Sequence, residues 1–224
     1  MYFSDKNLLT TIACKINNKV SYALEGSIFM AGGLMNWMQS SLQVFENISE
    51  TSKIASSVNP ASAVIIIPAF SGLGAPYWSS NSKAAIYGLT QDTGRSELIH
   101  ASLQAISLQT YDLLEAFKED FENNNISLSN SLSIDGGMIE NDWFVKNLAD
   151  ITEFDIFRAY TKESTALGAS LVSAIGIGYF KGFDNIKTLM NKNNKLKSTI
   201  DKNLRERIIE NWHKAVQKTI EMAD

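Results

Sequence analysis

A strand-turn-helix segment at residues 134–147 carries the residue types best suited to holding a ligand. It reads Ile-Asp-Gly-Gly-Met-Ile-Glu-Asn-Asp-Trp-Phe-Val-Lys-Asn, a buried strand that turns through Gly136 and Gly137 into an amphipathic helix. Glycine has no Cβ, so it allows a positive φ and lets a ligand lie directly on the main chain. The amides that open the following helix are expected to be unpaired and to favour polar or anionic groups. With Asn141, these features predict a nucleotide-binding corner, although a tight turn without a ligand fits the same segment.

Three further motifs help to distinguish these two interpretations. Residues 68–78 read Pro-Ala-Phe-Ser-Gly-Leu-Gly-Ala-Pro-Tyr-Trp, residues 23–26 read Ala-Leu-Glu-Gly, and residues 165–169 read Thr-Ala-Leu-Gly-Ala. Together with the Asp-Gly-Gly turn, they resemble the C-terminal half of the FGGY family of carbohydrate kinases, in the family's own order. Within that family the loop at 72–78 resembles that of the glycerol kinases. The resemblance therefore favours glycerol over a pentose as the substrate class.

The resemblance implies nucleotide-binding roles for five residues. Gly137 and Asn141 would contact adenine and ribose, the glycine by close backbone approach and the asparagine through its amide, and Gly136 belongs to the same corner. Asp92 and Ser96 stand where family members also approach the nucleotide, although many relatives have glycine where this chain has Asp92. The implied cofactor is ATP or ADP with Mg²⁺, whose protein ligands are expected in the N-terminal half of such a kinase. No residue of this chain is predicted to be catalytic or to bind a metal.

The resemblance covers only part of such a kinase. The family's Asp-x-Gly-Thr-Thr phosphate loop and its Gly-Asp-Gln-Gln segment, which bears the catalytic aspartate, do not occur in these 224 residues. We therefore expect one C-terminal nucleotide-binding domain over residues 1–224, catalytically incompetent alone, with a separately encoded N-terminal half as a candidate partner and glycerol bound only by the complete enzyme. Two alternatives stay open: the same domain of another FGGY sugar or polyol kinase, and a non-catalytic remnant that acts as a binding or assembly module.

The composition and net charge of the chain argue against several classes of protein. A net charge of −4 and a pI of about 5.3 argue against a protein that binds nucleic-acid backbones. No apolar run approaches the roughly 20 residues that span a bilayer, so no membrane partner is expected. The single cysteine, Cys14, cannot form an internal disulfide, and residues 1–6 lack the layout of a signal peptide. These features predict a cytoplasmic protein.

The sequence of the first half of the chain predicts a hairpin, several short elements and one long helix. Residues 8–16 and 20–27 read as strands joined at Asn17-Asn18-Lys19, because Asn tolerates the left-handed conformations of tight turns. From Ser96 the apolar residues fall at helical spacing until residues 123–125. The other predictions are a helix at 29–45, a polar stretch at 49–60, a strand at 64–68, an ordered loop at 71–83 and a strand at 85–89.

The second half predicts alternating strands and helices. Such alternation implies a largely parallel sheet with helices on both sides. The family resemblance implies a more specific α/β fold, the ribonuclease-H-like fold that actin, hexokinase and sugar kinases share, with a mixed sheet flanked by helices. Since the first strand of that fold lies in the middle of the sheet, we expect the strand at 8–16 to lack a central partner. The predicted elements are strands at 132–134 and 155–160, helices at 143–152, 165–177 and 204–222, and a solvated stretch at 184–199.

Overall fold

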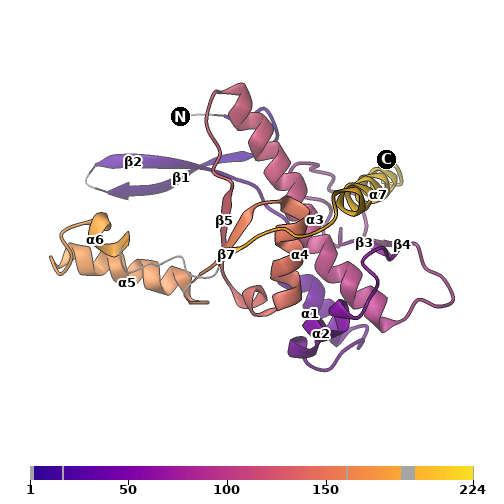
Figure 1. Cartoon of the computed structure of the whole chain (residues 1–224). Helices are drawn as coiled ribbons and strands as arrows, with labels where there is room; N and C mark the ends of the chain where they lie inside the picture. Colours follow the sequence, from indigo (N-terminus) through magenta and orange to yellow (C-terminus); the bar gives the residue numbers. More distant parts are fainter. Residues whose placement is uncertain (1–2, 17, 160, 188–194, 224) are drawn as a thin grey trace.

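The computed structural model describes residues 3–16, 18–159, 161–187 and 195–223, and Figure 1 shows the whole chain. A long helix, α3 (Arg95–Asn123), runs through the middle of the molecule. It begins at Gly94, whose N–H donates to the Glu97 carboxylate at 2.9 Å, and it ends at the asparagine-rich turn that the sequence predicts. Helix α3 positions the other elements because it packs against α2, α4, α1 and β3.

The hydrophobic core lies between α3 and α4 (Asp142–Thr152). Apolar residues recur at helical spacing on both helices, and α3 is buried on all sides from Ile99 to Gln109. Ile99 and Leu103 of α3 and Val145 and Ile151 of α4 are fully buried. Trp212 of the closing helix α7 (Lys202–Glu221) completes this core.

The described strands form three separate sheets. β1 (Leu9–Ile16) pairs antiparallel with β2 (Lys19–Glu25), and β3 (Ile65–Ile67) pairs antiparallel with β4 (Ala85–Tyr87). The third sheet is mixed, because β5 is parallel to β6 while β7 is antiparallel to it. Its strands are β5 (Ser131–Ile134), β6 (Asp155–Arg158) and β7 (Lys195–Leu196).

The prediction of a largely parallel sheet is therefore wrong for the described strands. Among the described strands only β5 and β6 pair in parallel, through a crossover that contains α4. β6 and β7 pair antiparallel, although α5 and α6 lie between them in the chain. The predicted hairpin is confirmed in its described part, with Asn18 at a φ of +61° in the turn, while Asn17 lies outside the described residues. The end of the predicted strand at 155–160 also falls partly outside them, at residue 160.

Two predicted elements before α3 differ from the structure. The helix expected at 29–45 is shorter, since α1 (Gly32–Ser40) ends before Gln43, whose φ is +53°. The stretch at 49–60, expected to be polar and mixed, contains the 3₁₀ turn η1 (Ile48–Glu50) and the helix α2 (Thr51–Ser56). The Glu50 carboxylate accepts from the amides of Asn47 and Glu46, which lowers the pKa of Glu50.

The predicted ordered loop at 71–83 has glycines where other residues would clash. A Cβ at Gly74 would lie 2.1 Å from the carbonyl oxygen of Ser27, and one at Gly72, where φ is +82°, would lie 2.7 Å from that of Ser79. These glycines shape the loop, as the sequence suggests. Trp78 anchors it by donating its indole N–H to the carbonyl of Asn7 at 2.7 Å.

Two segments stand outside the core (Figure 1). The β1–β2 hairpin exposes apolar side chains, with Ile12 64% and Tyr22 48% accessible. Helix α5 (Ser164–Gly176) contains no buried residue, and α6 (Phe183–Lys187) follows it. Among the described helices, none is both long and apolar enough to cross a lipid bilayer.

Candidate functional site

The Gly-Gly corner follows directly after β5. Gly136 has φ +85° and ψ −179°, a conformation that is essentially restricted to glycine. Gly137 then starts the 3₁₀ turn η2 (Gly137–Glu140), which leads to Asn141 at the start of α4. A Cβ added at Gly137 would meet no protein atom within 4 Å, so its main chain borders open space. This is the close-approach geometry that the sequence predicts for a ligand.

A cavity of about 310 Å³ opens at this corner. Its volume lies at the small end of the range for ligand pockets. The structure brings two of the predicted residues, Gly137 and Asn141, together in its wall, with Gly136 next to them in the chain. The other wall comes from η1 and α2, which the sequence did not connect with binding. The lining residues are Ile48, Ser49, Ser52, Gly137, Met138, Glu140 and Asn141.

The side-chain amide of Asn141 is held in one orientation. Its Oδ1 accepts from the N–H of Phe144 at 2.9 Å and so caps α4, while its Nδ2 donates to Thr51 Oγ1 at 2.9 Å. Thr51 Oγ1 must accept there, because its own proton is donated to the carbonyl of Ile48 at 2.7 Å. These two bonds leave Asn141 one N–H and one acceptor lone pair for a ligand.

The amides at the start of α4 are not free, so the expectation that they remain unpaired is wrong. The N–H of Trp143 donates to Ser52 Oγ at 3.1 Å, that of Phe144 donates to Asn141 Oδ1, and that of Val145 donates to the Asn141 carbonyl at 3.1 Å. Two side chains and one main-chain carbonyl satisfy these three groups, which would otherwise attract an anion. The corner is therefore better suited to a base and its sugar than to phosphate.

His100 supports the far side of this wall. Its Nδ1 lies 3.1 Å from the carbonyl of Ala55 in α2, and its ring lies 4.7 Å from that of Trp143. Burial lowers the pKa of His100, so the ring is neutral at neutral pH. A neutral ring that joins α2, α3 and α4 holds the two walls of the cavity together.

The charged groups around the corner are paired. Glu140, which lines the cavity, forms an ion pair of 2.5 Å with Lys162, and Asp142 forms one of 2.6 Å with Arg158. In the described part of the chain, no group of three or more His, Cys, Asp or Glu side chains could hold a metal ion. The site thus combines a small cavity and hydrogen-bonding groups with charges that are already ion-paired.

The remaining two predicted residues lie elsewhere. Asp92 is exposed in the turn before α3, and Ser96 is half-buried in the first turn of that helix. Neither is among the described residues that line the cavity. Their assignment to the nucleotide stays a prediction.

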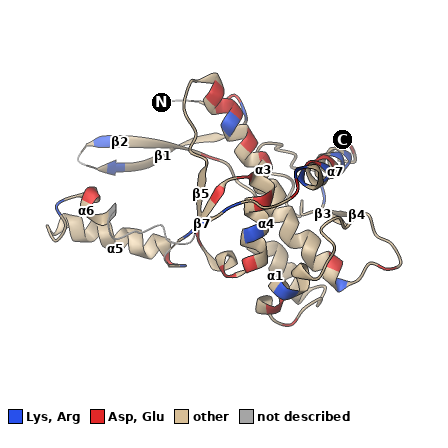
Figure 2. Ribbon diagram, in the orientation of Figure 1, with Lys and Arg blue, Asp and Glu red and all other residues tan. Residues whose placement is uncertain are grey.

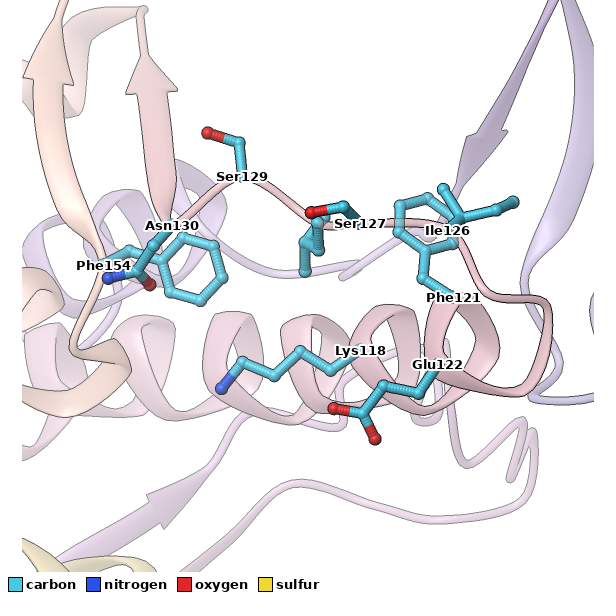
Figure 3. A pocket seen from close by; sticks show the side chains of 9 residues that line it. Lys118, Phe121, Glu122, Ile126, Ser127, Ser129, Asn130 and Phe154 are labelled. Carbon is cyan, nitrogen blue, oxygen red and sulfur yellow. The ribbon is translucent and has the colours of Figure 1, made fainter.

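A second hollow lies between the end of α3 and residues 126–130 (Figure 3). It measures about 340 Å³ and has Phe121 and Phe154 in its wall. Lys118 lies 5.4 Å from the ring centroid of Phe154 and forms an ion pair of 2.5 Å with Glu115. Since this cation is already engaged, the hollow offers a ligand less than the Gly-Gly corner does.

Comparison with known sequences gives consistent matches. The profile described as "FGGY family of carbohydrate kinases, C-terminal domain" matches residues 5–177. The curated glycerol kinase of Allorhizobium ampelinum is 37% identical over 217 residues, which are 97% of this chain and 43% of that protein. The glycerol kinase of Streptococcus sanguinis is 38% identical over 224 residues, which are 100% of this chain and 44% of that protein. The chain thus spans less than half the length of these relatives.

Solved structures agree with the predicted fold class. A glycerol kinase from Plasmodium falciparum, solved with ADP, superposes with a TM-score of 0.85 at 34% identity, covering 96% of this chain and 42% of that one. A gluconate kinase from Lactobacillus acidophilus superposes with a TM-score of 0.76 at 18% identity, covering 97% of this chain and 42% of that one. The second likeness shows the fold alone. Together they confirm an α/β fold of the sugar-kinase class, which includes a mixed sheet with flanking helices.

Proposed function

Because the chain belongs to the FGGY family of carbohydrate kinases, we propose that it is the ATP- and ADP-binding C-terminal domain of a glycerol kinase. The family reaction transfers a phosphoryl group from ATP to glycerol and gives ADP and glycerol 3-phosphate. The observation that carries the proposal is the cavity at the Gly-Gly corner, where open space at Gly137 meets the oriented amide of Asn141. The cytoplasm remains the proposed location.

Adenosine fits this cavity better than a phosphate chain does. The first amides of α4 are already paired, and the cavity is small, with a polar amide and apolar side chains in its wall. We assign the purine and ribose to the neighbourhood of Gly137 and Asn141, with Gly136 setting the turn. The roles of Asp92 and Ser96 near the nucleotide remain part of this proposal.

Glycerol is the proposed substrate class because the similar proteins point to it. The curated relatives named above are glycerol kinases, and the solved glycerol kinase is nearly twice as identical to this chain as the solved gluconate kinase. We propose that the glycerol pocket, the catalytic base and the ligands of Mg²⁺ belong to another part of the kinase, such as a separately encoded N-terminal half. Among the residues that the structure describes, no group of three or more His, Cys, Asp or Glu side chains could hold that ion.

Nucleotide binding at the corner is tested with a matched pair of glycine variants. Without contacts to the phosphates, we expect ADP to bind the purified chain in the high micromolar to millimolar range, roughly 4–6 kcal/mol. Gly137→Val places a branched side chain in the cavity and should abolish binding. Gly182→Val is the control, because a Cβ there also meets no protein atom within 4 Å and Gly182 does not line the cavity. Calorimetry that shows equal ADP binding in both variants would move the site elsewhere.

The proposal also expects no turnover by this chain alone. Phosphoryl transfer requires a positioned base and neutralisation of the developing charge. Glu140, the carboxylate among the described lining residues, is ion-paired with Lys162. The purified chain with ATP, Mg²⁺ and glycerol should yield glycerol 3-phosphate only at the enzyme-free rate. Saturable turnover would contradict this part of the proposal.

A further inference from the structure

Ser52 is a polar group in the cavity wall to which no role has been assigned. It lies in the first turn of α2, is half-buried, and lines the cavity opposite the Gly-Gly corner. Its Oγ accepts the N–H of Trp143 at 3.1 Å. This bond comes from the start of α4, so it fixes the hydroxyl oxygen of one wall against the main chain of the other.

The hydroxyl of the neighbouring Thr51 differs from that of Ser52 in the hydrogen bonds that it already makes. Thr51 is fully buried, donates its proton to the carbonyl of Ile48 and accepts from Asn141, so its hydroxyl has no proton left to donate. Ser52 accepts one bond, and within the described part of the chain no atom accepts its proton. A serine hydroxyl carries one donor and two acceptor sites, so Ser52 retains a donor at the cavity wall.

The cavity therefore contains two positioned groups that can read a base. The amide of Asn141 has one N–H and one lone pair left, and Ser52 supplies an O–H whose oxygen is already held. Preorganised groups of this kind cost little ordering free energy when a ligand binds. Adenine has three ring nitrogens, N1, N3 and N7, that accept hydrogen bonds and could take the proton of Ser52.

We propose that Ser52 is a base-specificity residue whose hydroxyl donates to a ring nitrogen of the bound adenine. The proposal rests on the proposed binding of ADP at this corner and adds the group that recognises the base. It also gives α2 a function, since the helix presents Ser52 while Thr51 ties the same turn to Asn141.

The first test compares serine variants in the purified chain by NMR titration with ADP. A typical net hydrogen bond corresponds to a change of about threefold to tenfold in affinity. Ser52→Ala should weaken ADP binding by that factor, while Ser52→Thr, which keeps the hydroxyl, should restore most of it. Ser57→Ala is the matched control because Ser57 is exposed at the end of the same helix and does not line the cavity, and it should leave the affinity within about twofold. Equal affinities of the Ser52→Ala and Ser57→Ala variants would overturn the proposal.

The second test identifies the accepting atom. The 1-deaza, 3-deaza and 7-deaza analogues of ADP each replace one ring nitrogen with C–H. The unaltered chain should bind one of them more weakly by the same factor, and Ser52→Ala should not weaken that analogue further. If all three bind the unaltered chain as tightly as ADP does, Ser52 does not read a ring nitrogen, whatever the variants do.

Different results would contradict the proposed nucleotide site and the proposed role of Ser52. If ADP does not bind the unaltered chain, or binds equally to Gly137→Val, the proposed nucleotide site is wrong and the role of Ser52 falls with it. If the unaltered chain binds ADP, Gly137→Val abolishes the binding and Ser52→Ala leaves the affinity unchanged, only the assignment of Ser52 is wrong.

Discussion

The carboxylate of Asp112 joins three segments at one point of the molecule. Its side chain accepts from Tyr77 Oη at 2.9 Å, from Trp212 Nε1 at 2.6 Å and from His213 Nε2 at 2.9 Å. Burial, then the nearby Asp112 charge, raises the pKa of Tyr77, and the bond to Asp112 raises the pKa of His213. One buried acid thus links the 71–83 loop and α7 to α3.

The raised pKa of His213 predicts a pH-dependent contribution to stability. The groups that face its ring are Asp112, Glu115 and Tyr111 of α3. Since the folded pKa lies above the unfolded value of about 6.5, the stabilisation is complete below that pH and is lost as pH rises through the folded pKa. The half-exposed ring limits the effect to about 0.2–1 kcal/mol. Urea unfolding should show a deficit of this size for His213→Gln at pH 5.5 and none at pH 9, and a constant deficit would exclude the mechanism.

Gly136 and Gly137 provide a second prediction at this scale. Alanine at Gly136 would have to adopt φ +85° and ψ −179°, at a cost of about 1–3 kcal/mol. Alanine at Gly137 has room for its Cβ and needs no positive φ, so its effect should stay near zero. Unfolding midpoints of the two variants should therefore separate clearly. Equal midpoints would mean that the turn relaxes in the variant.

The sequence could predict the Gly-Gly corner but not all of its surroundings. Two adjacent glycines before an amphipathic helix are a local signal, and Asn141 stands at the cap position of that helix. Ser52 carries no such signal, because its bond to Trp143 joins residues 91 apart. This long-range bond occupies the amide of Trp143, whereas Asn141, the cap residue itself, occupies those of Phe144 and Val145. A single hint was available, since the Asn47-x-x-Glu50 spacing is typical of a helix start.

At the scale of elements, long periodic helices follow from the sequence, whereas the pairing of strands does not. The apolar period predicts α3, α4 and α7 because each packs apolar residues at helical spacing into the core. Short strands such as β3 and β4 can be located by their β-branched and aromatic residues, but their partners depend on how the loop between them folds. Helix α1 is shorter than its apolar pattern suggests, because the chain turns at Gln43.

Helix α5 should be the least protected of the longer helices. None of its residues is buried, whereas seven residues of α4 are, and helices in proteins owe most of their stability to packing of an apolar face. Local opening of α5 should therefore cost less free energy than opening of α4. Hydrogen–deuterium exchange followed by mass spectrometry should show exchange in α5 at least roughly tenfold faster than in α4. Similar protection of both helices would require contacts that cover α5 in solution.

The molecule combines a well-packed core around α3, α4 and α7 with exposed elements, the β1–β2 hairpin and α5. Figure 2 shows charges of both signs along α3 and α7, whereas α5 carries no charged residue. The β1–β2 hairpin exposes Leu9, Ile12, Val20 and Tyr22. Among the described strands, β1 pairs only with β2, and β5 pairs only with β6. The open edge of β1 or of β5 is suited to pairing with an added strand.

We propose that a strand from the N-terminal half of a glycerol kinase pairs with the open edge of β1, as the family resemblance implies. Leaving this edge unpaired costs less free energy than leaving a buried strand unpaired. The reason is that the hairpin is exposed to water, so its amides can hydrogen-bond to solvent. What remains uncovered is apolar surface, which is stabilising only when it is buried, at about 25 cal/mol per Å². The isolated chain should therefore be marginally stable and prone to edge-to-edge association.

Mixing the two halves of the kinase tests this expectation. An N-terminal half that ends with the strand proposed to pair with β1 should raise the melting temperature of this chain and produce glycerol-dependent ATP consumption. The matched control is the same half without that strand, which should do neither, because both the sheet and the ATP cleft depend on the added pairing. Exchange protection of β1 and α5 should rise in the first mixture only, since binding covers what the isolated chain exposes. The opposing result is cooperative melting of this chain alone above about 55 °C, which is within the ordinary range of intact domains. It would show that the open edges of β1 and β5 cost the fold little stability. The proposal that β1 needs an added strand would then lose its physical basis.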